Sequence, residues 1–238
     1  MPTSVVRTAE ASALRLGGLT PLSLTDYPGQ LSAVLFCQGC SWSCAYCHNT
    51  HLLDAGATPA LDWAAAQDFL RRRKGLLDAV VFSGGEPTLQ DGLADAMRRT
   101  RDLGFKVGLH TAGAYPRRFG PLLPLADWVG FDVKAPFARY DALTGVPGSG
   151  AAARESLSLL LSSGVDCECR TTVHPSLFTA AELAALSASL FALGARRHVL
   201  QIFRADGCVD AALNAATGAC AELIAQAAAL EPRVERRG

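Results

Sequence analysis

Six short apolar runs, each followed by a longer amphipathic stretch, constrain the possible folds of this chain more than any other feature. The runs predict buried strands at residues 31–37, 78–83, 105–110, 128–133, 167–173 and 198–203. The stretches between them predict helices at residues 62–73, 92–103, 116–123, 151–163 and 180–193, and a last helix over about 210–230. Asp62 and Thr179 are candidate N-caps, and Glu182 would complete a capping box with Thr179. Such regular alternation implies parallel strands joined by right-handed crossovers, an α/β fold.

The number of strands bounds the architecture further. Six strands are too few for a closed eight-stranded barrel, which typically needs about 250 residues. An open doubly wound sheet and a partial barrel both fit the count. No repeat, low-complexity tract or linker interrupts the alternation, so we expect residues 1–238 to form one domain.

Charge and hydropathy exclude several classes of protein. The 22 Lys and Arg residues balance 22 Asp and Glu residues, which argues against a general nucleic-acid-binding surface. Half of the residues are hydrophobic and 18% are charged, so the chain is not a disordered polymer. No apolar run reaches the roughly 18 residues of a membrane span, and residues 1–20 lack the apolar core of a secretory signal. We therefore expect a cytoplasmic globular protein that binds neither membranes nor nucleic acid.

Eight cysteines, four of them within eleven residues, carry the strongest chemical signal. The close group comprises Cys37, Cys40, Cys44 and Cys47, at and just after the first predicted strand. A disulfide framework rarely crowds its cysteines so closely, whereas a metal site does. Neighbouring thiolates repel one another unless a cation neutralises them, and a soft metal is their natural partner.

Four chemistries compete for this group. Cys44-Ala-Tyr-Cys47-His48 matches the attachment pattern of c-type haem, a chemistry of exported proteins. Zinc could take Cys40, Cys44, Cys47 and His48, although adjacent residues such as Cys47 and His48 seldom reach one metal. Coincidental buried cysteines are the third possibility, but Gly39 and the serines between them indicate a loop. The fourth is an iron–sulfur cube, in which three thiolates would leave one iron open.

The spacing of Cys40, Cys44 and Cys47, with the aromatic Tyr46 before the last, resembles the signature of the radical S-adenosylmethionine superfamily. The resemblance implies a partial (β/α)6 TIM-like barrel with helices outside, in which these three cysteines hold a 4Fe-4S cluster. The open iron would chelate the methionine end of S-adenosyl-L-methionine, and Tyr46 would lie against the adenine. Cys37 lies outside the motif, so we expect it to be a bystander thiol.

Two motifs after the second and third strands agree with this resemblance. Ser83-Gly84-Gly85-Glu86-Pro87 looks like the GGEP motif of the superfamily. Paired glycines let a backbone approach a ligand closely, and Glu86 can accept a hydrogen bond from an ammonium group. His110 ends the third strand, and the turn that follows resembles a T-N-G turn with Ala112 in place of Asn. Gly84, Gly85, Glu86 and His110 are therefore expected to bind the cofactor.

Three later motifs resemble those of glycyl-radical activating enzymes. They are Asp132-Val-Lys134, Arg170-Thr-Thr-Val-His-Pro and Gln201-Ile-Phe-Arg, at the fourth, fifth and sixth strands. Alternate strand residues share a face, so Asp132 and Lys134 can point together into the barrel. Asp132, Lys134, Arg170 and Gln201 would then contribute to the cofactor site.

The remaining cysteines are expected to lie outside the site. If Arg170 points into the barrel, then Cys167 and Cys169 point outward beneath the helices and pack there. Cys208 and Cys220 have no clustered partners, so a second iron–sulfur cluster is not expected.

The resemblance extends over about residues 17–205 and is closest to the activases of anaerobic ribonucleoside-triphosphate reductases. It implies an enzyme that reductively cleaves S-adenosylmethionine and generates a glycyl radical on the reductase, with a flavodoxin- or ferredoxin-type electron donor. Two alternatives stay open. One is a small radical enzyme that acts on a small molecule, as a carboxy-deazaguanine synthase does. The other is a non-catalytic iron–sulfur or zinc binding module.

Overall fold

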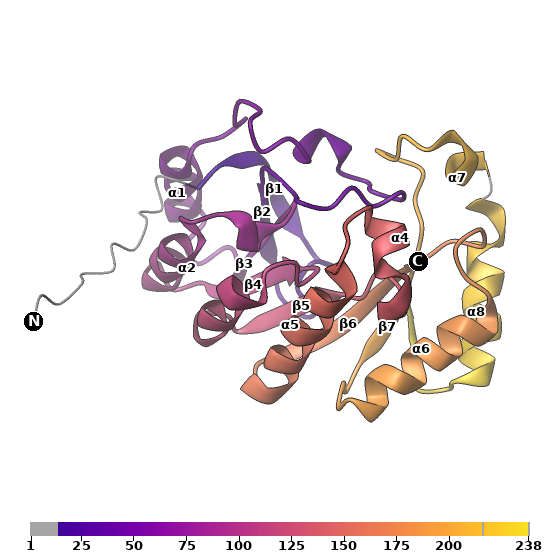
Figure 1. The fold of residues 1–238 in the computed structure, drawn as a ribbon. Coiled ribbons are helices and arrows are strands. Elements are labelled where there is room, and N and C mark those ends of the chain that lie inside the picture. The colour runs from indigo at the N-terminus through magenta and orange to yellow at the C-terminus, as the bar shows by residue number, and fades with distance from the viewer. Residues whose placement is uncertain (1–13, 216, 238) are drawn as a thin grey trace, which may run out of the picture.

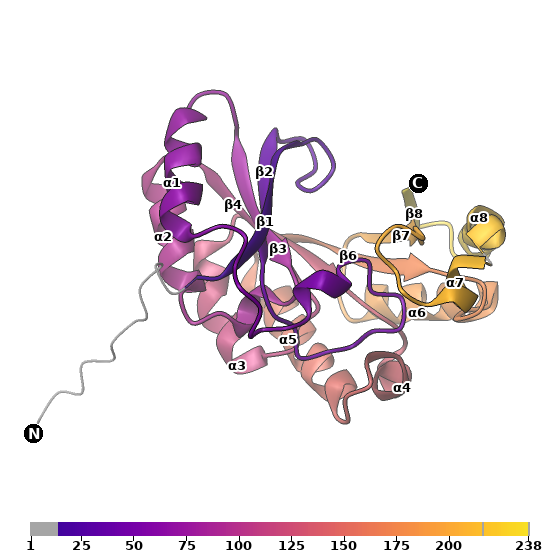
Figure 2. The ribbon, with the colours of Figure 1, turned by 90° about the horizontal axis from the view of Figure 1, so that it is seen from above.

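The computed structural model describes residues 14–215 and 217–237, whose strands form one curved sheet (Figure 1). The strands follow one another across the sheet in chain order: β1 (Leu16–Ser23), β2 (Ser32–Cys37), β3 (Ala79–Gly84), β4 (Lys106–Thr111), β5 (Trp128–Asp132), β6 (Asp166–Val173), β7 (His198–Ile202) and β8 (Glu235–Arg237). β1 runs antiparallel to β2, and each later neighbouring pair is parallel. Viewed from above, the sheet curves into a partial barrel (Figure 2), which confirms the predicted fold class.

The helices cover the outer face of this curve (Figures 1 and 2). They are α1 (Trp63–Arg72), α2 (Leu93–Asp102), α3 (Pro116–Phe119), α4 (Tyr140–Thr144), α5 (Ser149–Ser163), α6 (Ala180–Ala192), α7 (Ala211–Ala215) and α8 (Cys220–Leu230). Both predicted N-caps are present: Asp62 accepts a hydrogen bond from the Ala65 amide, and Thr179 and Glu182 form a capping box. Across residues 14–215 and 217–237, no helix is long and apolar enough to cross a membrane.

The structure corrects the sequence-based boundaries in two helices. The helix expected over 116–123 ends as α3, and a 3-10 helix over Gly120–Leu125 follows, because Pro121 and Pro124 lack the amide hydrogens that an α-helix needs. The helix expected over about 210–230 is divided into α7, a 3-10 turn at Thr217–Ala219 and α8. Gly218 lies in that turn, where its low helix propensity favours a break.

Two strands add to the six predicted ones. β1 occupies a segment whose glycines and Pro21 obscure any alternating pattern, and it lies at an edge of the sheet, where proline is tolerated. β8 is short and charged, with the sequence Glu-Arg-Arg, and extends the sheet beside β7.

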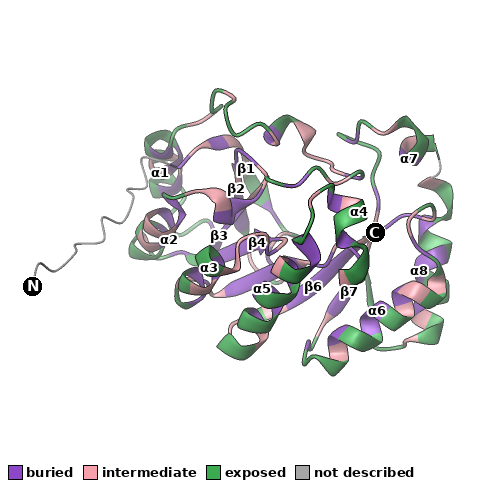
Figure 3. Cartoon of the chain, in the orientation of Figure 1, coloured by how far each residue is buried: buried purple, intermediate pink, exposed green. Residues whose placement is uncertain are grey.

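Alternating residues of the strands separate an outer core from an inner one, and the buried strands contrast with exposed helix surfaces (Figure 3). Ala33, Leu35 and Cys37 of β2 belong to the outer core, which they share with buried residues of α1 and α2. Val34 faces inward and belongs to a smaller cluster with Tyr27 and Trp128, whose rings stack with centroids 5.1 Å apart. The connection from β1 to β2 therefore packs into the barrel rather than lying on its surface.

Candidate functional site

A cavity of about 390 Å³ lies inside the barrel and reaches the loops that follow the parallel strands. This volume falls within the range of roughly 300–1,000 Å³ that is typical of small-molecule sites. Every residue that the sequence predicts for the site lines this cavity: Cys40, Cys44, Tyr46, Cys47, Gly84, Gly85, Glu86, His110, Asp132, Lys134, Arg170 and Gln201. Segments separated by up to about 160 residues of sequence thus contribute to one site, because the strands that carry them are parallel and adjacent.

The part of the cysteine loop (residues 38–50) that surrounds Cys44 is held in place by α4. The amides of Ser43 and Ala45, which flank Cys44, donate hydrogen bonds to the carbonyls of Thr144 and Leu143, at 3.0 and 3.3 Å. The Trp42 and Tyr140 rings also meet edge to face, with centroids 5.9 Å apart. The backbone around Cys44 is therefore fixed by a helix about 100 residues away, so the loop does not depend on its own sequence alone for its shape.

The thiols that line the cavity have the chemistry that an iron–sulfur cluster requires. Burial raises the pKa of the Cys40 thiol to about 12, although the Trp42 amide offsets part of the shift, and burial raises the pKa of Cys44 as well. Coordination to a soft metal supplies the positive charge that these groups need in order to ionise. In the described part of the chain, no three His, Cys, Asp or Glu side chains converge on a single ion. A cube does not need that convergence, because each thiolate binds a different iron.

The glycine turn at the end of β3 requires a residue without a side chain at its first position, Gly84. Gly84 has a φ of +115°, and a Cβ there would lie 2.4 Å from the Cys37 amide nitrogen. The turn places Glu86 at the cavity wall, where its side chain is almost fully buried. The backbone of this turn therefore packs against the end of β2, where the cysteine loop begins.

The carboxylate of Glu86 is already bound by the protein. Its Oε1 accepts hydrogen bonds from the Thr88 amide at 3.1 Å, the Thr88 hydroxyl at 2.5 Å and the Thr111 hydroxyl at 2.7 Å. Its Oε2 accepts one hydrogen bond, from the Ala112 amide at 3.0 Å. Burial raises the pKa of Glu86 in spite of these donors. Glu86 therefore fixes the turn after β4 and retains accepting capacity at Oε2.

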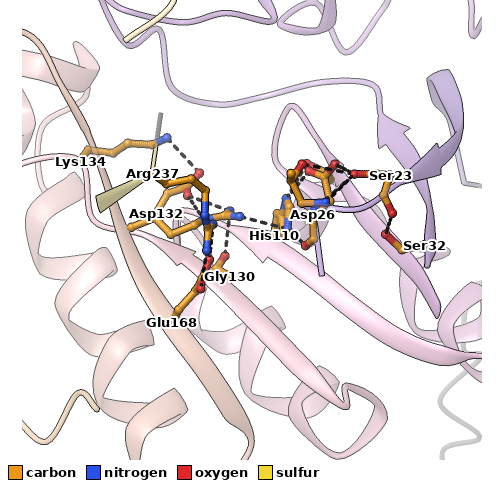
Figure 4. A network of polar contacts seen from close by, with 12 residues as sticks. Ser23, Asp26, Ser32, His110, Gly130, Asp132, Lys134, Glu168 and Arg237 are labelled. Atoms are coloured by element: carbon orange, nitrogen blue, oxygen red, sulfur yellow. Dashed lines mark hydrogen bonds and ion pairs between the residues drawn. The ribbon is translucent and has the colours of Figure 1, made fainter. Parts of the chain in front are cut away.

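A row of polar side chains crosses the inside of the barrel, and Figure 4 shows Lys134, Asp132 and His110 along it. Asp132 Oδ1 accepts from Nε and Nη2 of Arg170, both at 2.9 Å, and Oδ2 accepts from Lys134 Nζ at 3.2 Å. Burial alone would raise the pKa of Asp132, but the charges of Arg170 and Lys134 outweigh it and hold this pKa well below its usual range. The predicted inward parity of all three side chains is confirmed.

His110 continues this row toward the β1–β2 connection. Burial and the adjacent Arg170 guanidinium lower the pKa of His110 to about 4, so the imidazole is neutral near pH 7. Its Nδ1 lies 3.2 Å from the Ser83 hydroxyl, and its Nε2 lies 2.8 Å from the Asp26 carbonyl oxygen and 3.1 Å from Arg170 Nη1. A neutral imidazole nitrogen is either a donor or an acceptor. Nε2 therefore forms a hydrogen bond with the Asp26 carbonyl or with the Arg170 guanidinium, but not with both.

Several residues of the cavity have no counterpart among the predicted ones. Asp26 comes from the β1–β2 connection, where the sequence shows only the turn signal Tyr27-Pro-Gly. Arg237 comes from β8 and makes two hydrogen bonds, at 2.7 and 3.0 Å, to Glu168, a fully buried residue of β6 (Figure 4). Glu168 is two positions from Arg170 and shares its face, so the strand parity could have identified it.

The cysteines outside the motif lie away from the cavity lining. Cys37 is fully buried in the outer core, and burial raises its pKa. Cys169 belongs to the same core, and Cys167 packs against it, as the inward orientation of Arg170 predicts. Cys208 and Cys220 share a small apolar cluster with Tyr46.

Comparisons with known proteins identify the family of this chain. The sequence profile described as the Radical SAM superfamily matches residues 34–179. A protein of Methanocaldococcus jannaschii named as a glycyl-radical enzyme activating enzyme is 34% identical over 172 residues, which cover 68% of this chain and 69% of that protein. The pyruvate formate-lyase-activating enzyme of Clostridium pasteurianum is 31% identical over 125 residues, or 50% of this chain and 52% of that enzyme.

Solved structures show the same fold. Streptococcus suis SuiB bound to S-adenosylmethionine superposes with a TM-score of 0.64 at 13% identity, over 84% of this chain and 48% of SuiB. QueE from Escherichia coli superposes with a TM-score of 0.58 at 19% identity, over 94% of this chain and 93% of QueE. The chain thus spans about half the length of SuiB and of the C. pasteurianum enzyme, and nearly the whole of QueE.

Proposed function

This chain belongs to the Radical SAM superfamily, whose enzymes use a 4Fe-4S cluster and S-adenosylmethionine, and on that premise we propose that it activates a glycyl-radical enzyme. The proposed target is an anaerobic ribonucleoside-triphosphate reductase, and the proposed reductant is a flavodoxin- or ferredoxin-type protein. The observation that carries the proposal is the 34% identity to the M. jannaschii protein across two thirds of both chains. The motifs at the ends of β5, β6 and β7 support it, because they line the cavity together.

The residues of the cavity are assigned as follows. Cys40, Cys44 and Cys47 would ligate the cluster, since all three thiols line one cavity. When bound, the cluster would supply the electron for reductive cleavage of S-adenosylmethionine, a chemistry that takes a hydrogen atom from the target and releases methionine and 5′-deoxyadenosine. Tyr46 would pack against the adenine, because its ring is buried at the wall of the cavity beside Lys134.

The polar groups would bind the amino-acid end of the cofactor. Asp132, Lys134 and Arg170 form a linked set of charges, in which each side chain is held by another before any ligand arrives. Such preorganisation lowers the cost of ordering side chains on binding. The free accepting capacity of Glu86 Oε2 suits an ammonium group, and Gly84, Gly85, His110 and Gln201 also line the cavity.

The activity is tested with the anaerobically reconstituted protein, dithionite, S-adenosylmethionine and a candidate anaerobic reductase. A glycine-centred doublet in the electron paramagnetic resonance spectrum of the reductase is expected. Reductase that carries glycine deuterated at Cα should transfer deuterium into 5′-deoxyadenosine, since that atom is the one removed. Cleavage of S-adenosylmethionine without either signal, across several glycyl-radical proteins, would reject the activase.

The ligand assignment has a separate test. Cys40→Ala, Cys44→Ala and Cys47→Ala should each abolish the absorbance of the roughly four irons expected per chain. Cys169→Ala is the control, because its thiol is buried in the outer core and does not line the cavity. Zinc in place of iron after anaerobic purification would contradict the assignment.

A second candidate keeps the chemistry and changes the substrate. The 7-carboxy-7-deazaguanine synthase of Thermococcus kodakarensis is 29% identical over 121 residues, which cover 42% of this chain and 48% of that enzyme. This candidate requires a small heterocyclic substrate rather than a protein. Deuterium transfer from a labelled heterocycle into 5′-deoxyadenosine, with none from the reductase, would favour it over the activase.

A further inference from the structure

The segment that follows β7, residues 203–208, lies along the second half of the cysteine loop, residues 45–50. Four kinds of contact join the two segments. The Cys208 thiol donates to the Ala45 carbonyl at 3.7 Å, and the Thr50 hydroxyl donates to the Gly207 carbonyl at 3.2 Å. The Arg204 amide donates to His48 Nε2 at 3.4 Å. The His48 ring also packs on Phe203, with centroids 5.1 Å apart.

Gly207 also lies against the backbone of His48, where a side chain would not fit. Its φ is +80°, and a Cβ at this position would lie 2.0 Å from the His48 carbonyl oxygen and 3.0 Å from the carbonyl carbon. Both atoms belong to the backbone, so they cannot move aside as the end of a flexible side chain can. Any larger residue at position 207 must therefore push the two segments apart.

Segment 203–208 is itself firmly anchored. Phe203 and Cys208 are buried in one apolar cluster with Tyr46, Leu213 and Cys220. The Phe203 amide donates to the Val173 carbonyl at 3.2 Å, and Asn214 Nδ2 donates to the Cys208 carbonyl at 2.8 Å. The segment is thus tied to β6, α7 and α8 independently of the cysteine loop, and it can act as a fixed support.

We propose that segment 203–208 positions Cys47 for cluster binding, with Gly207 as the residue that permits the contact. Both neighbours of Cys47 are held by it: Tyr46 is buried in the shared apolar cluster, and the carbonyl of His48 meets Gly207. α4 does the same for the two neighbours of Cys44 from the other side of the loop. The role of the segment rests on the proposed assignment of Cys40, Cys44 and Cys47 as ligands, and it holds whichever substrate the enzyme uses.

The test compares Gly207→Ala with Gly164→Ala. Gly164 ends α5 with a φ of +76°, close to that of Gly207, but a Cβ there meets nothing within 4 Å. Both variants place alanine at a similar positive φ, so a difference between them reports the contact with His48. The readouts are iron per chain after anaerobic reconstitution and the rate of iron loss to an added chelator. Loss of residues that support metal ligands typically weakens metal binding about 10- to 100-fold, so iron loss should accelerate by a similar factor in Gly207→Ala alone.

A second pair of variants covers the case in which Gly207→Ala fails to fold. Thr50→Val removes the hydroxyl that binds the Gly207 carbonyl at nearly constant volume, and Thr50→Ser restores it. Thr50→Val should lose iron faster than wild type, and Thr50→Ser should return toward the wild-type rate. Circular dichroism of the iron-free chains, with equal melting temperatures for the two variants, excludes a general loss of stability.

The outcomes separate this proposal from the ligand assignment. If Cys44→Ala retains its iron, then the ligand assignment itself is wrong. If Cys44→Ala loses iron while Gly207→Ala matches Gly164→Ala and Thr50→Val matches Thr50→Ser, then the ligands are right and the positioning role is refuted.

Discussion

Replacing Asp132 by Asn alters the group that holds Arg170 and Lys134 together at the wall of the cavity. The carboxylate accepts from both cations, through Oδ1 and Oδ2 respectively. An amide has one accepting oxygen and one donating NH2 group. Whichever way the Asn side chain is turned, it sets a donor against a donor, either at Arg170 or at Lys134.

The expected effect follows from this loss of one contact. A hydrogen bond to a charged group contributes about 1.5–3 kcal/mol, and roughly 1.4 kcal/mol corresponds to a tenfold change in an equilibrium constant. The Asp132 side chain is 31% exposed, so water partly replaces the lost contact and the lower end of the range applies. We therefore expect the affinity for S-adenosylmethionine to fall about tenfold, because Lys134 and Arg170 no longer hold the positions that the cofactor meets.

The assay is calorimetric titration of the anaerobically reconstituted protein with S-adenosylmethionine, together with iron analysis. Asp132→Asn should keep its full iron content, since Asp132 is not among the proposed ligands. Asp68→Asn is the matched control, because it removes an exposed ion pair with Arg71 far from the site. If the two variants bind the cofactor equally well at equal iron content, the role derived for the Asp132 network is wrong.

Three further predictions concern the outer core, the last strand and pH. Cys37→Ala should retain both iron and cofactor cleavage, because this thiol is fully buried among outer-core residues; iron loss as complete as in a cysteine-loop variant would overturn this. Arg237→Met should lower the free energy of unfolding by about 3 kcal/mol in urea titrations, since among the described residues it leaves the buried Glu168 carboxylate with Arg197 alone, at 3.7 Å. The double variant Glu168→Met/Arg237→Met should recover much of the loss, and no recovery would contradict the pairing. Burial lowers the pKa of His198 from 6.5 to about 4. As the pH falls from 6.5 to about 4, the unfolded chain therefore protonates this histidine while the folded chain does not, and the free energy of unfolding should decrease. In thermal melts, His198→Gln should make this decrease with pH smaller.

The six interior strands could be predicted because each is a local run of apolar residues with turn signals around it. β1 and β8 could not, for physical reasons that differ. Gly17, Gly18 and Pro21 hide the alternation in β1, and its strand conformation comes from pairing with β2. β8 carries only charged residues, two of which, Glu235 and Arg237, pair with Arg197 and Glu168. Partners so distant in sequence leave no local pattern.

The predicted part of the candidate site follows from one rule, that the ends of parallel strands meet at one rim. Asp132 and Arg170 are directly paired in the register of β5 and β6, so motifs read at strand ends become neighbours in space. Asp26 escapes this rule because it lies on an antiparallel hairpin whose turn packs back into the barrel. The contacts of Gly207 escape it as well, because the segment after β7 is shaped by its anchoring to α7 and α8.

β6 also protects the fold against mispairing. Its residues alternate between thiols that face the outer core, Cys167 and Cys169, and charged groups that face the inside of the barrel, Glu168 and Arg170. A slip of one position would exchange the two sets, since successive strand residues point to opposite faces. It would bury two charges without partners, which costs several kcal/mol for each ion. It would also turn the two thiols from the outer core toward the polar side chains inside the barrel. The alternation along a single strand therefore makes its register costly to change.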